Sequence, residues 1–276
     1  GEYVDTIELT GDQTLVLTGE YVNGDVYMKK GATVANIVFD GTVSANEFDL
    51  YQDGSEGNAL DTINVTSSTI ESLSLWTYNA AQVNIDIDTD GAVDLELASV
   101  DADVAAVIDA TSSTSDLNVS TDQEDVAVLL TGSGDDTVDW NSDGVANDLS
   151  IETNAGDDRV NFNFDLDSGI DGVVTVDLGA GNDRIDVSNT LGDGSYDGNG
   201  LYLTEFKAEQ DHFDGGDGVD EITVLSGGVM VREEYDRLNL DIVNFEELRI
   251  MTENDDNEVD ASRLTDFNKI TFDGAW

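Results

Sequence analysis

The sequence predicts an all-β protein whose strands form a right-handed parallel β-helix, or β-solenoid. Short segments of alternating apolar and polar residues follow one another, interrupted by Gly or Asp about every ten residues. In the second half, one acidic phrase recurs at intervals of 22 and 25 residues. Stacked coils produce both patterns, because each coil repeats the same strands and the same corner.

In the amino-terminal part, Ile, Val and Leu are expected to face the core of each strand and Asn, Asp, Ser and Thr to face outward. The expected strands are residues 6–10, 14–18, 25–28, 34–39, 61–65, 72–76, 83–88, 93–97, 106–109 and 116–120. Asp-Gly pairs, such as Asp53-Gly54 and Asp90-Gly91, also favour tight hairpins. Sandwich-like antiparallel elements in this third of the chain are therefore an open alternative.

From residue 126 onward, strands at 126–130, 148–152 and 173–177 each precede an acidic turn. The turns read Gly-Ser-Gly-Asp-Asp-Thr-Val at 132–138, Asn-Ala-Gly-Asp-Asp-Arg-Val at 154–160 and Gly-Ala-Gly-Asn-Asp-Arg-Ile at 179–185. A fourth copy at 215–222, Gly-Gly-Asp-Gly-Val-Asp-Glu-Ile, fits the nonapeptide template G-G-x-G-x-D-x-U-x at every specified position.

The Asp at the sixth template position recurs at Asp136, Asp158, Asp183 and Asp220, at intervals of 22, 25 and 37 residues. Intervals of this length predict a large coil with about three short strands per turn, whereas tandem nonapeptides repeat about every nine or eighteen residues. The acidic turns should then stack at one corner. The apolar residue at position eight should anchor the next strand in the core, at Val138, Val160, Ile185 and Ile222.

Two regions are expected, residues 1–125 rich in strands and residues 126–276 carrying the acidic turns, as parts of one continuous elongated domain. An insertion at 187–212 explains the 37-residue interval and is a place for contacts with partners. Helix is expected only at 204–210 and 231–238. The worn copy at 255–260 is interpreted as a plain turn.

The charge excludes several classes of partner. The chain has 61 acidic and 10 basic residues, a net charge of −51, and 43 of the acids are Asp. Nucleic acid and anionic membrane are excluded as principal partners, because both would repel this surface. Such a charge destabilises a compact state unless cations neutralise it, although a halophile's solvated acidic surface is the alternative explanation. The chain has no apolar run of transmembrane length, and Gly1 opens directly onto alternating sequence, so we expect neither a membrane span nor an amino-terminal signal peptide. A processed chain, an excised fragment and export without a cleaved leader are open alternatives.

Calcium is the metal that this composition favours. Ca²⁺ takes six to eight hard oxygen ligands, whereas Mg²⁺ wants tight octahedral geometry and Zn²⁺ or Cu²⁺ want His or Cys; the chain has one His and no Cys. Gly with positive φ turns carbonyls inward, and an ion between stacked turns can take oxygens from both. The candidate ligand positions are Gly132, Gly134, Asp135, Asp136, Asn154, Gly156, Asp157, Asp158, Gly179, Gly181, Asp183, Gly216, Gly218 and Asp220. An acidic turn without metal is the alternative.

These turns resemble those of the repeats-in-toxin (RTX) proteins, which the type I pathway exports and calcium folds outside the cell. The rest of the chain, rich in Thr, Ser, Asn, Asp and Ala, resembles the surface-layer (S-layer) proteins of Gram-negative bacteria in composition. The two resemblances imply an extracellular, calcium-dependent structural protein at the bacterial cell surface. Its implied partners are further copies of itself, in a layer or filament, and cell-surface polysaccharide.

Catalytic chemistry is not indicated, and we predict no catalytic or cofactor-binding residue besides the metal ligands. Carboxylates are too abundant for any pair to be informative, and His212 has no accompanying constellation of bases. The alternatives to a structural protein are an adhesive or carbohydrate-binding module of a large RTX adhesin and, third, a β-helical polysaccharide enzyme. Aromatic residues such as Trp76, Trp140 and Trp276 fit a sugar platform, core packing or subunit contacts. The Arg232, Arg237, Arg249 and Arg263 group fits pairing with a neighbouring subunit or within the chain.

Overall fold

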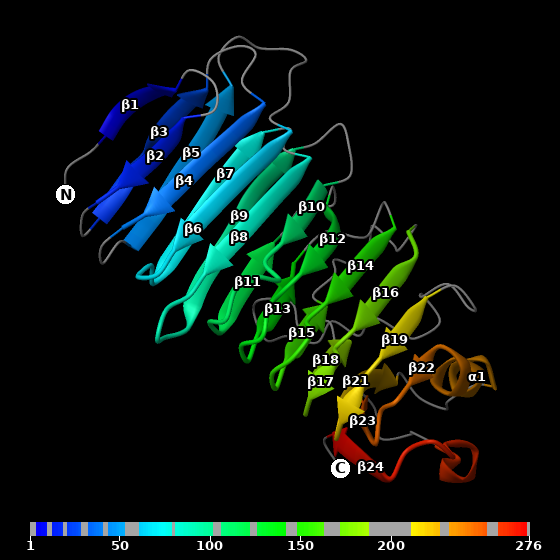
Figure 1. Ribbon diagram of the computed structural model, residues 1–276. Coiled ribbons are helices and arrows are strands. Elements are labelled where there is room, and N and C mark those ends of the chain that lie inside the picture. Colours follow the sequence, from blue (N-terminus) through cyan, green and yellow to red (C-terminus); the bar gives the residue numbers. More distant parts are fainter. Residues whose placement is uncertain are drawn as a thin grey trace. The chain divides into compact units, whose positions relative to one another are not determined.

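The computed structural model describes residues 4–9, 13–18, 21–28, 33–40, 44–52, 61–78, 81–101, 106–121, 126–141, 148–162, 172–187, 211–226, 232–252 and 259–274. The chain divides into two compact units, Gly1–Asp136 and Thr137–Trp276. Each unit is a stack of coils whose strands run side by side (Figure 1).

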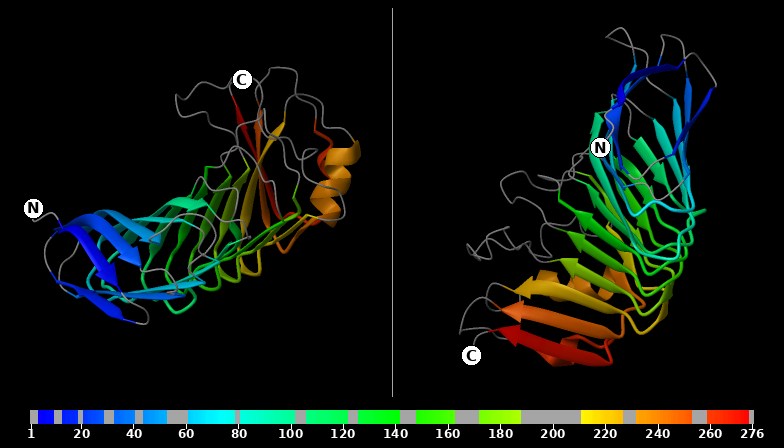
Figure 2. Two further views of the ribbon diagram at one scale, coloured as in Figure 1. Left: turned by 90° about the horizontal axis from the view of Figure 1, so that it is seen from above. Right: turned by 90° about the vertical axis from the view of Figure 1, so that its left-hand side faces the viewer.

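The first unit consists of two parallel sheets, ordered β1-β3-β5-β7-β9-β11 and β2-β4-β6-β8-β10-β12. Odd and even strands alternate along the chain, so each coil contributes one strand to each sheet, and the two sheets lie as two layers (Figure 2). The strands are β1 (Val4–Leu9), β2 (Thr14–Leu17), β3 (Tyr21–Met28), β4 (Val34–Phe39), β5 (Ser44–Gln52), β6 (Thr62–Ser67), β7 (Ser72–Tyr78), β8 (Gln82–Ile87), β9 (Val93–Asp101), β10 (Ala106–Asp109), β11 (Leu117–Thr121) and β12 (Val126–Leu130).

The second unit continues the same plan, with sheets β13-β15-β18-β21-β23-β24 and β14-β16-β19-β22 and a small pair β17-β20. Its strands are β13 (Thr137–Trp140), β14 (Leu149–Glu152), β15 (Arg159–Phe162), β16 (Val174–Asp177), β17 (Ala180–Gly181), β18 (Arg184–Val187), β19 (His212–Asp214), β20 (Asp217–Gly218), β21 (Glu221–Ser226), β22 (Ile242–Val243), β23 (Glu247–Thr252) and β24 (Lys269–Gly274). The described residues of this unit also include helix α1 (Arg232–Leu240) and the 3₁₀ turn η2 (Ala261–Arg263).

The prediction of a parallel solenoid is confirmed, and the alternative of antiparallel sandwich elements is wrong. Every strand pair that the structure describes is parallel, including those from β1 to β9. Asp90-Gly91, a candidate hairpin, lies in a corner between β8 and β9, where the chain crosses from one sheet to the other. The same turn residues suit both structures, because both need a change of direction.

The described residues of most coils contain two strands of four or more residues, and not the expected three. Within these residues a third strand appears as the two-residue segments β17 and β20, which pair with each other inside two acidic turns.

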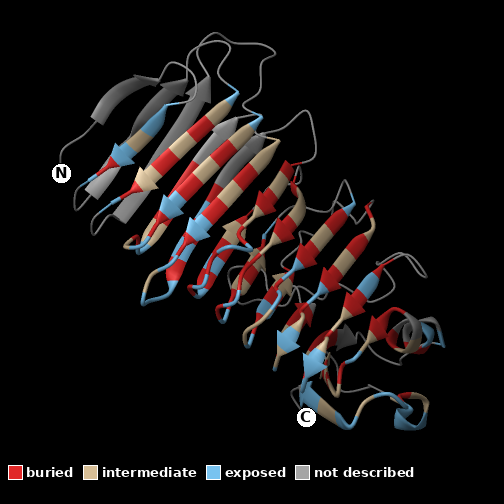
Figure 3. Cartoon of the chain, viewed as in Figure 1, coloured by how far each residue is buried: buried red, intermediate tan, exposed pale blue. Residues whose placement is uncertain are grey.

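The core consists of rows of apolar side chains that run from coil to coil. In the first unit, Ala35, Ile63, Val83, Ile108 and Leu129 form one such row, and each is at most 1% exposed. Figure 3 shows the corresponding alternation of buried and less buried residues along the strands. Full burial of one such side chain contributes roughly 1.5–3 kcal/mol, which is the main force holding one coil on the next.

The second unit confirms the position-eight prediction. Val138, Val160, Ile185 and Ile222 pair in register on consecutive strands β13, β15, β18 and β21, and all four are 0% exposed. Their register reproduces the 22-, 25- and 37-residue intervals. Each acidic turn is therefore placed in its coil by an apolar residue two positions later.

Helix α1 confirms the expected helix at 231–238, while the other candidate, at 204–210, lies outside the described residues. The same holds for most of the insertion at 187–212 and of the worn copy at 255–260. None of the described helices has the length and apolar character needed to cross a membrane.

Candidate metal site

The acidic turns occupy one kind of corner. At this corner the chain leaves β12, β14, β16 or β19 and crosses to the other sheet. In the first unit the turn links β12 to Thr137, and in the second unit turns lead from β14 to β15, from β16 to β18 and from β19 to β21. Their placement at equivalent points of successive coils confirms that the turns of the second unit stack at one corner.

The position-six aspartates of the second unit form a buried column. Asp158, Asp183 and Asp220 are 2%, 2% and 0% exposed. The backbone N–H of Asp158 donates to Oδ1 of Asp183 at 2.7 Å, and the N–H of Asp183 donates to Oδ1 of Asp220 at 2.8 Å. Each carboxylate therefore caps the backbone of the coil before it.

The column ends on Glu246, whose Oε2 accepts the backbone N–H of Asp220 at 3.1 Å. Glu246 occupies the position-six place of the next coil, because Glu221 pairs with Glu247 and Ile222 with Leu248. Sequence inspection missed this residue, since its corner has lost the template glycines and is shorter. Glu246 is identified by Leu248, which pairs in register with the position-eight residue Ile222.

The first unit contains one such aspartate, Asp136, which is 1% exposed. Its Oδ1 accepts the backbone N–H of Leu117 at 2.8 Å, and its side chain also hydrogen-bonds Thr131. Leu117 therefore stands at position six of the preceding coil, where the coils of the second unit have an acid.

The glycines and Asn154 have two separate structural roles. Positive φ angles occur at Asn154 (66°), Gly156 (144°), Gly179 (87°) and Gly216 (87°), so Asn154 adopts an αL conformation at template position two. The expectation of positive φ is wrong for four other glycines, which lie outside the positive-φ region: Gly132, Gly134, Gly181 and Gly218.

These four glycines are instead required by close backbone stacking. A Cβ on Gly181 would lie 1.6 Å from the carbonyl oxygen of Gly156, and one on Gly218 would lie 1.5 Å from that of Gly181. In the first unit, Cβ atoms on Gly132 and Gly134 would lie 1.9 Å and 2.4 Å from the carbonyl oxygens of the preceding corner. Only glycine lets these corners approach so closely.

Two of the predicted ligand residues lie at the surface. Asp135 and Asp157 are exposed. The Asp157 carboxylate accepts the backbone N–H of Asn182 at 2.8 Å, and the backbone N–H of Asp135 donates to Asp116 at 2.8 Å. These position-five residues form a second, outer line of contacts between coils.

Burial makes the position-six aspartates electrostatically costly. Desolvation raises the pKa of Asp136 from 3.8 to about 6 against the hydrogen bonds that it accepts. Desolvation, together with the charges of Glu246, Asp214 and Asp217, likewise raises the pKa of Asp220 to about 6. Charges that repeat at the coil spacing of about 4.8 Å repel by roughly 3–4 kcal/mol per neighbouring pair at an effective dielectric constant of about 20. A proton or a cation is needed to offset this cost.

At Gly181 and Gly218, a carbonyl oxygen of one coil and a carboxylate oxygen of the next lie close together. The point where a Cβ of Gly181 would lie is 1.6 Å from the Gly156 carbonyl oxygen and 2.9 Å from Oδ1 of Asp183. The corresponding point at Gly218 is 1.5 Å from the Gly181 carbonyl oxygen and 3.2 Å from Oδ1 of Asp220. Hard oxygens of both kinds are the donors that Ca²⁺ takes.

The second carboxylate oxygen of Asp220, Oδ2, is buried and has no hydrogen-bond partner among the described residues. No group of three or more His, Cys, Asp or Glu side chains within the described ranges is arranged to hold a metal. A bound Ca²⁺ would therefore rely on carbonyl oxygens and water beside one or two carboxylates. The residues fit calcium in donor type, and each coil supplies only part of a coordination shell.

Buried acids also occur at the opposite end of the strands, which sequence inspection did not single out. Asp211 is 2% exposed, and its Oδ1 accepts the backbone N–H of Val174 at 2.7 Å. The equivalent Asp148 is exposed and accepts the backbone N–H of Val173 at 2.9 Å. Asp241 is 7% exposed. Each of these acids directly precedes a strand, and this position is the sequence signal that could have found them.

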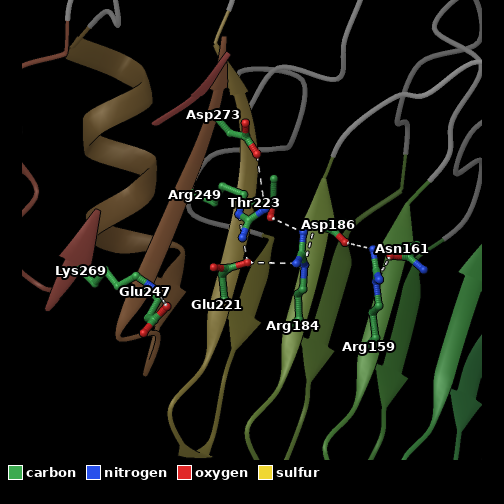
Figure 4. A network of polar contacts seen from close by, with 10 residues as sticks. All are labelled: Arg159, Asn161, Arg184, Asp186, Glu221, Thr223, Glu247, Arg249, Lys269 and Asp273. Carbon is green, nitrogen blue, oxygen red and sulfur yellow. Dashed lines mark hydrogen bonds and ion pairs between the residues drawn. The ribbon is translucent and has the colours of Figure 1, made fainter. Parts of the chain in front are cut away.

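A network of ion pairs lies on the outward side of β15, β18, β21, β23 and β24 (Figure 4). Arg184 contacts Asp186 at 2.6 Å and Glu221 at 3.2 Å, and Arg249 contacts Glu221 at 3.3 Å. Burial opposes ionisation of Asp186, but hydrogen bonds from Arg184 and Thr223 and the charges of Arg184 and Arg159 lower its pKa.

The Arg residues whose side chains are described make contacts within the chain. Arg249 also contacts Asp273 at 3.5 Å, Arg232 pairs with Asp236 at 3.3 Å, and Arg263 lies 4.5 Å from the centre of the Tyr235 ring. The side chain of Arg237 is outside the described set.

Trp140 is fully buried in the core, so it is no part of a sugar platform, and the side chains of Trp76 and Trp276 are not among those described. His212 is exposed on β19.

Comparison of the chain with protein-family models, with curated proteins and with solved structures gave no match. The parallel strand order establishes the β-solenoid fold.

Proposed function

We propose that the chain is an extracellular structural protein of the bacterial cell surface, in which calcium bound at the acidic turns stabilises the solenoid. In this role the protein self-assembles into a layer or filament. The resemblances to RTX and S-layer proteins motivate the cellular setting, and cell-surface polysaccharide is the proposed anchor.

The buried column of Asp158, Asp183 and Asp220 is the observation that carries the proposal. Three acids stacked out of water in a chain of net charge −51 destabilise the fold at neutral pH unless a cation neutralises them. Calcium supplies that charge. The resemblance to RTX proteins implies that the chain folds outside the cell, where calcium is available.

The proposal is tested by calcium-dependent assembly of the purified chain. Millimolar calcium is expected to convert monomers into ordered sheets or filaments that negative-stain electron microscopy detects, and a chelator is expected to disperse them. Magnesium at the same concentration serves as the control, because it keeps its hydration water. A chain that stays monodisperse in calcium at every concentration would remove the assembly role, and glycan-array binding by that monomer would support the adhesin instead.

A further inference from the structure

The outward face of one sheet in the first unit differs in charge from the rest of this acidic chain. On β4, β6 and β8, the side chains of Asn36, Asn64 and Asn84 lie in one row, because these residues pair in register. Nδ2 of Asn64 donates to Oδ1 of Asn36 at 2.8 Å, and Nδ2 of Asn84 donates to Oδ1 of Asn64 at 2.7 Å. Gln82 closes the ladder by donating to Oδ1 of Asn84 at 2.8 Å.

Apolar side chains flank this amide ladder on both sides. Val34 and Val107 belong to the row on one side, and Val38 and Val16 to the row on the other. Val16 is 52% exposed. These residues and the ladder face outward from the sheet, since the side chains that alternate with them are buried (Figure 3). We call the outward side of β2, β4, β6, β8, β10 and β12 the amide face.

The strands of the amide face carry two charged residues. Asp109 pairs with Asn84 and so continues the ladder row, and Asp86 lies at the far end of the row that contains Val16 and Val38. On the opposite sheet of the same unit, β9 presents the exposed acids Asp94 and Glu96. A chain of net charge −51 repels its own copies over most of its surface. The amide face is where two copies can approach with little repulsion.

The chemistry of the amide face is complementary to itself. Asn64 and Asn84 each use one of two N–H groups and one oxygen lone pair within the ladder, so a second donor and a second acceptor remain for a partner. A carboxylate offers acceptors alone and cannot pair with its own kind. We infer that the amide face is a contact surface for the same face of a second copy, related by a two-fold axis. This inference rests on the self-assembly proposed above and names the surface that it uses.

The size of the face predicts a weak, repeated contact. Six strands at about 4.8 Å and roughly three outward residues at about 7 Å each span about 24 Å by 17 Å, or on the order of 400 Å² per copy. Two copies would bury about 800 Å², half of the roughly 1,600 Å² of a standard stable interface. An isolated dimer is therefore transient, and many such contacts in an array hold through avidity.

The experiment introduces charge on this face in the full chain. Val16→Glu changes an exposed side chain and leaves the core intact, and Asn64→Asp replaces the central amide of the ladder. Asn118→Asp is the matched control, because Asn118 is an exposed amide of the opposite sheet that also donates to a neighbouring coil, at 2.9 Å to Asp94. Circular dichroism confirms that each variant is folded, and sedimentation velocity in calcium measures self-association.

Val16→Glu and Asn64→Asp are expected to weaken self-association at least about tenfold, a change of about 1.4 kcal/mol, while Asn118→Asp associates like the wild type. If the wild type assembles and both amide-face variants assemble equally well, the face is not the contact and the self-assembly proposal stands. If the wild type stays monomeric in calcium, both proposals fail. An amide face that is needed for retention on polysaccharide-coated beads and not for self-association would also overturn the inference.

Discussion

Replacing Asp220 by Asn is predicted to stabilise the chelated protein at neutral pH. The Asp220 carboxylate is fully buried, and its pKa is raised from 3.8 to about 6 by burial and by neighbouring acids. One pKa unit corresponds to about 1.4 kcal/mol, so ionising this group costs the folded state up to about 3 kcal/mol. Asn removes the charge and keeps an oxygen that can accept the N–H of Asp183.

The pH dependence has a definite sign. Folded Asp220 holds its proton up to about pH 6, whereas the unfolded chain loses it near pH 3.8. The folded state therefore binds more protons between these values, and the free energy of unfolding falls as the pH rises through this window. The cost is absent below about pH 4 and fully present above about pH 6.

Urea unfolding followed by circular dichroism, in chelator and across this pH range, measures the effect. Asp220→Asn should be more stable than the wild type at about pH 7, by up to about 3 kcal/mol, and equal to it at about pH 4. Asp90→Asn, a change at an exposed corner residue, should leave the pH dependence unchanged. A variant that is less stable than the wild type in chelator at neutral pH would show that the buried charge is not the cost we infer.

Three further substitutions test the stacking of the coils by thermal or urea unfolding. Gly218→Ala should destabilise by about 3 kcal/mol or more, because its Cβ would lie 1.5 Å from a carbonyl oxygen of the preceding coil. Gly91→Ala, with nothing within 4 Å, should have little effect, and equal losses for both would refute the stacking argument. Ile185→Ala should cost about 2–5 kcal/mol through the cavity left in a row of apolar side chains, and a loss below about 1 kcal/mol would contradict that row. Arg184→Gln should cost more than the exposed Arg232→Gln, which is expected to change stability by about 0.5 kcal/mol or less, and an equal effect would contradict the network's contribution.

The solenoid could be predicted because its determinants are periodic. Alternation of apolar and polar residues located most strands, and the intervals between Asp136, Asp158, Asp183 and Asp220 gave the register of the coils. Both follow from residue type and spacing alone. The number of long strands per coil was not predictable in this way, because corner residues contribute to coil length without revealing whether they extend or turn.

The remaining features depend on contacts between coils that no local pattern records. Glu246 takes the place of the template Asp in a corner without glycines, and only the pairing of the following strand reveals it. The requirement for Gly at position 218 arises from the carbonyl of another coil and not from its own φ angle. The burial of Asp211 likewise became visible only with its partner Val174, which lies 37 residues away in sequence.

The most direct test of the calcium-stabilised solenoid is the free energy of unfolding at about pH 7.5, measured in chelator and in rising calcium concentration. Calcium that binds the folded chain is expected to raise it by about 2.7 kcal/mol per site at roughly 100 times the dissociation constant. The column predicts this gain in the wild type, a smaller gain in Asp220→Asn, and little gain with magnesium. Equal free energies of unfolding in chelator and in millimolar calcium would contradict the account.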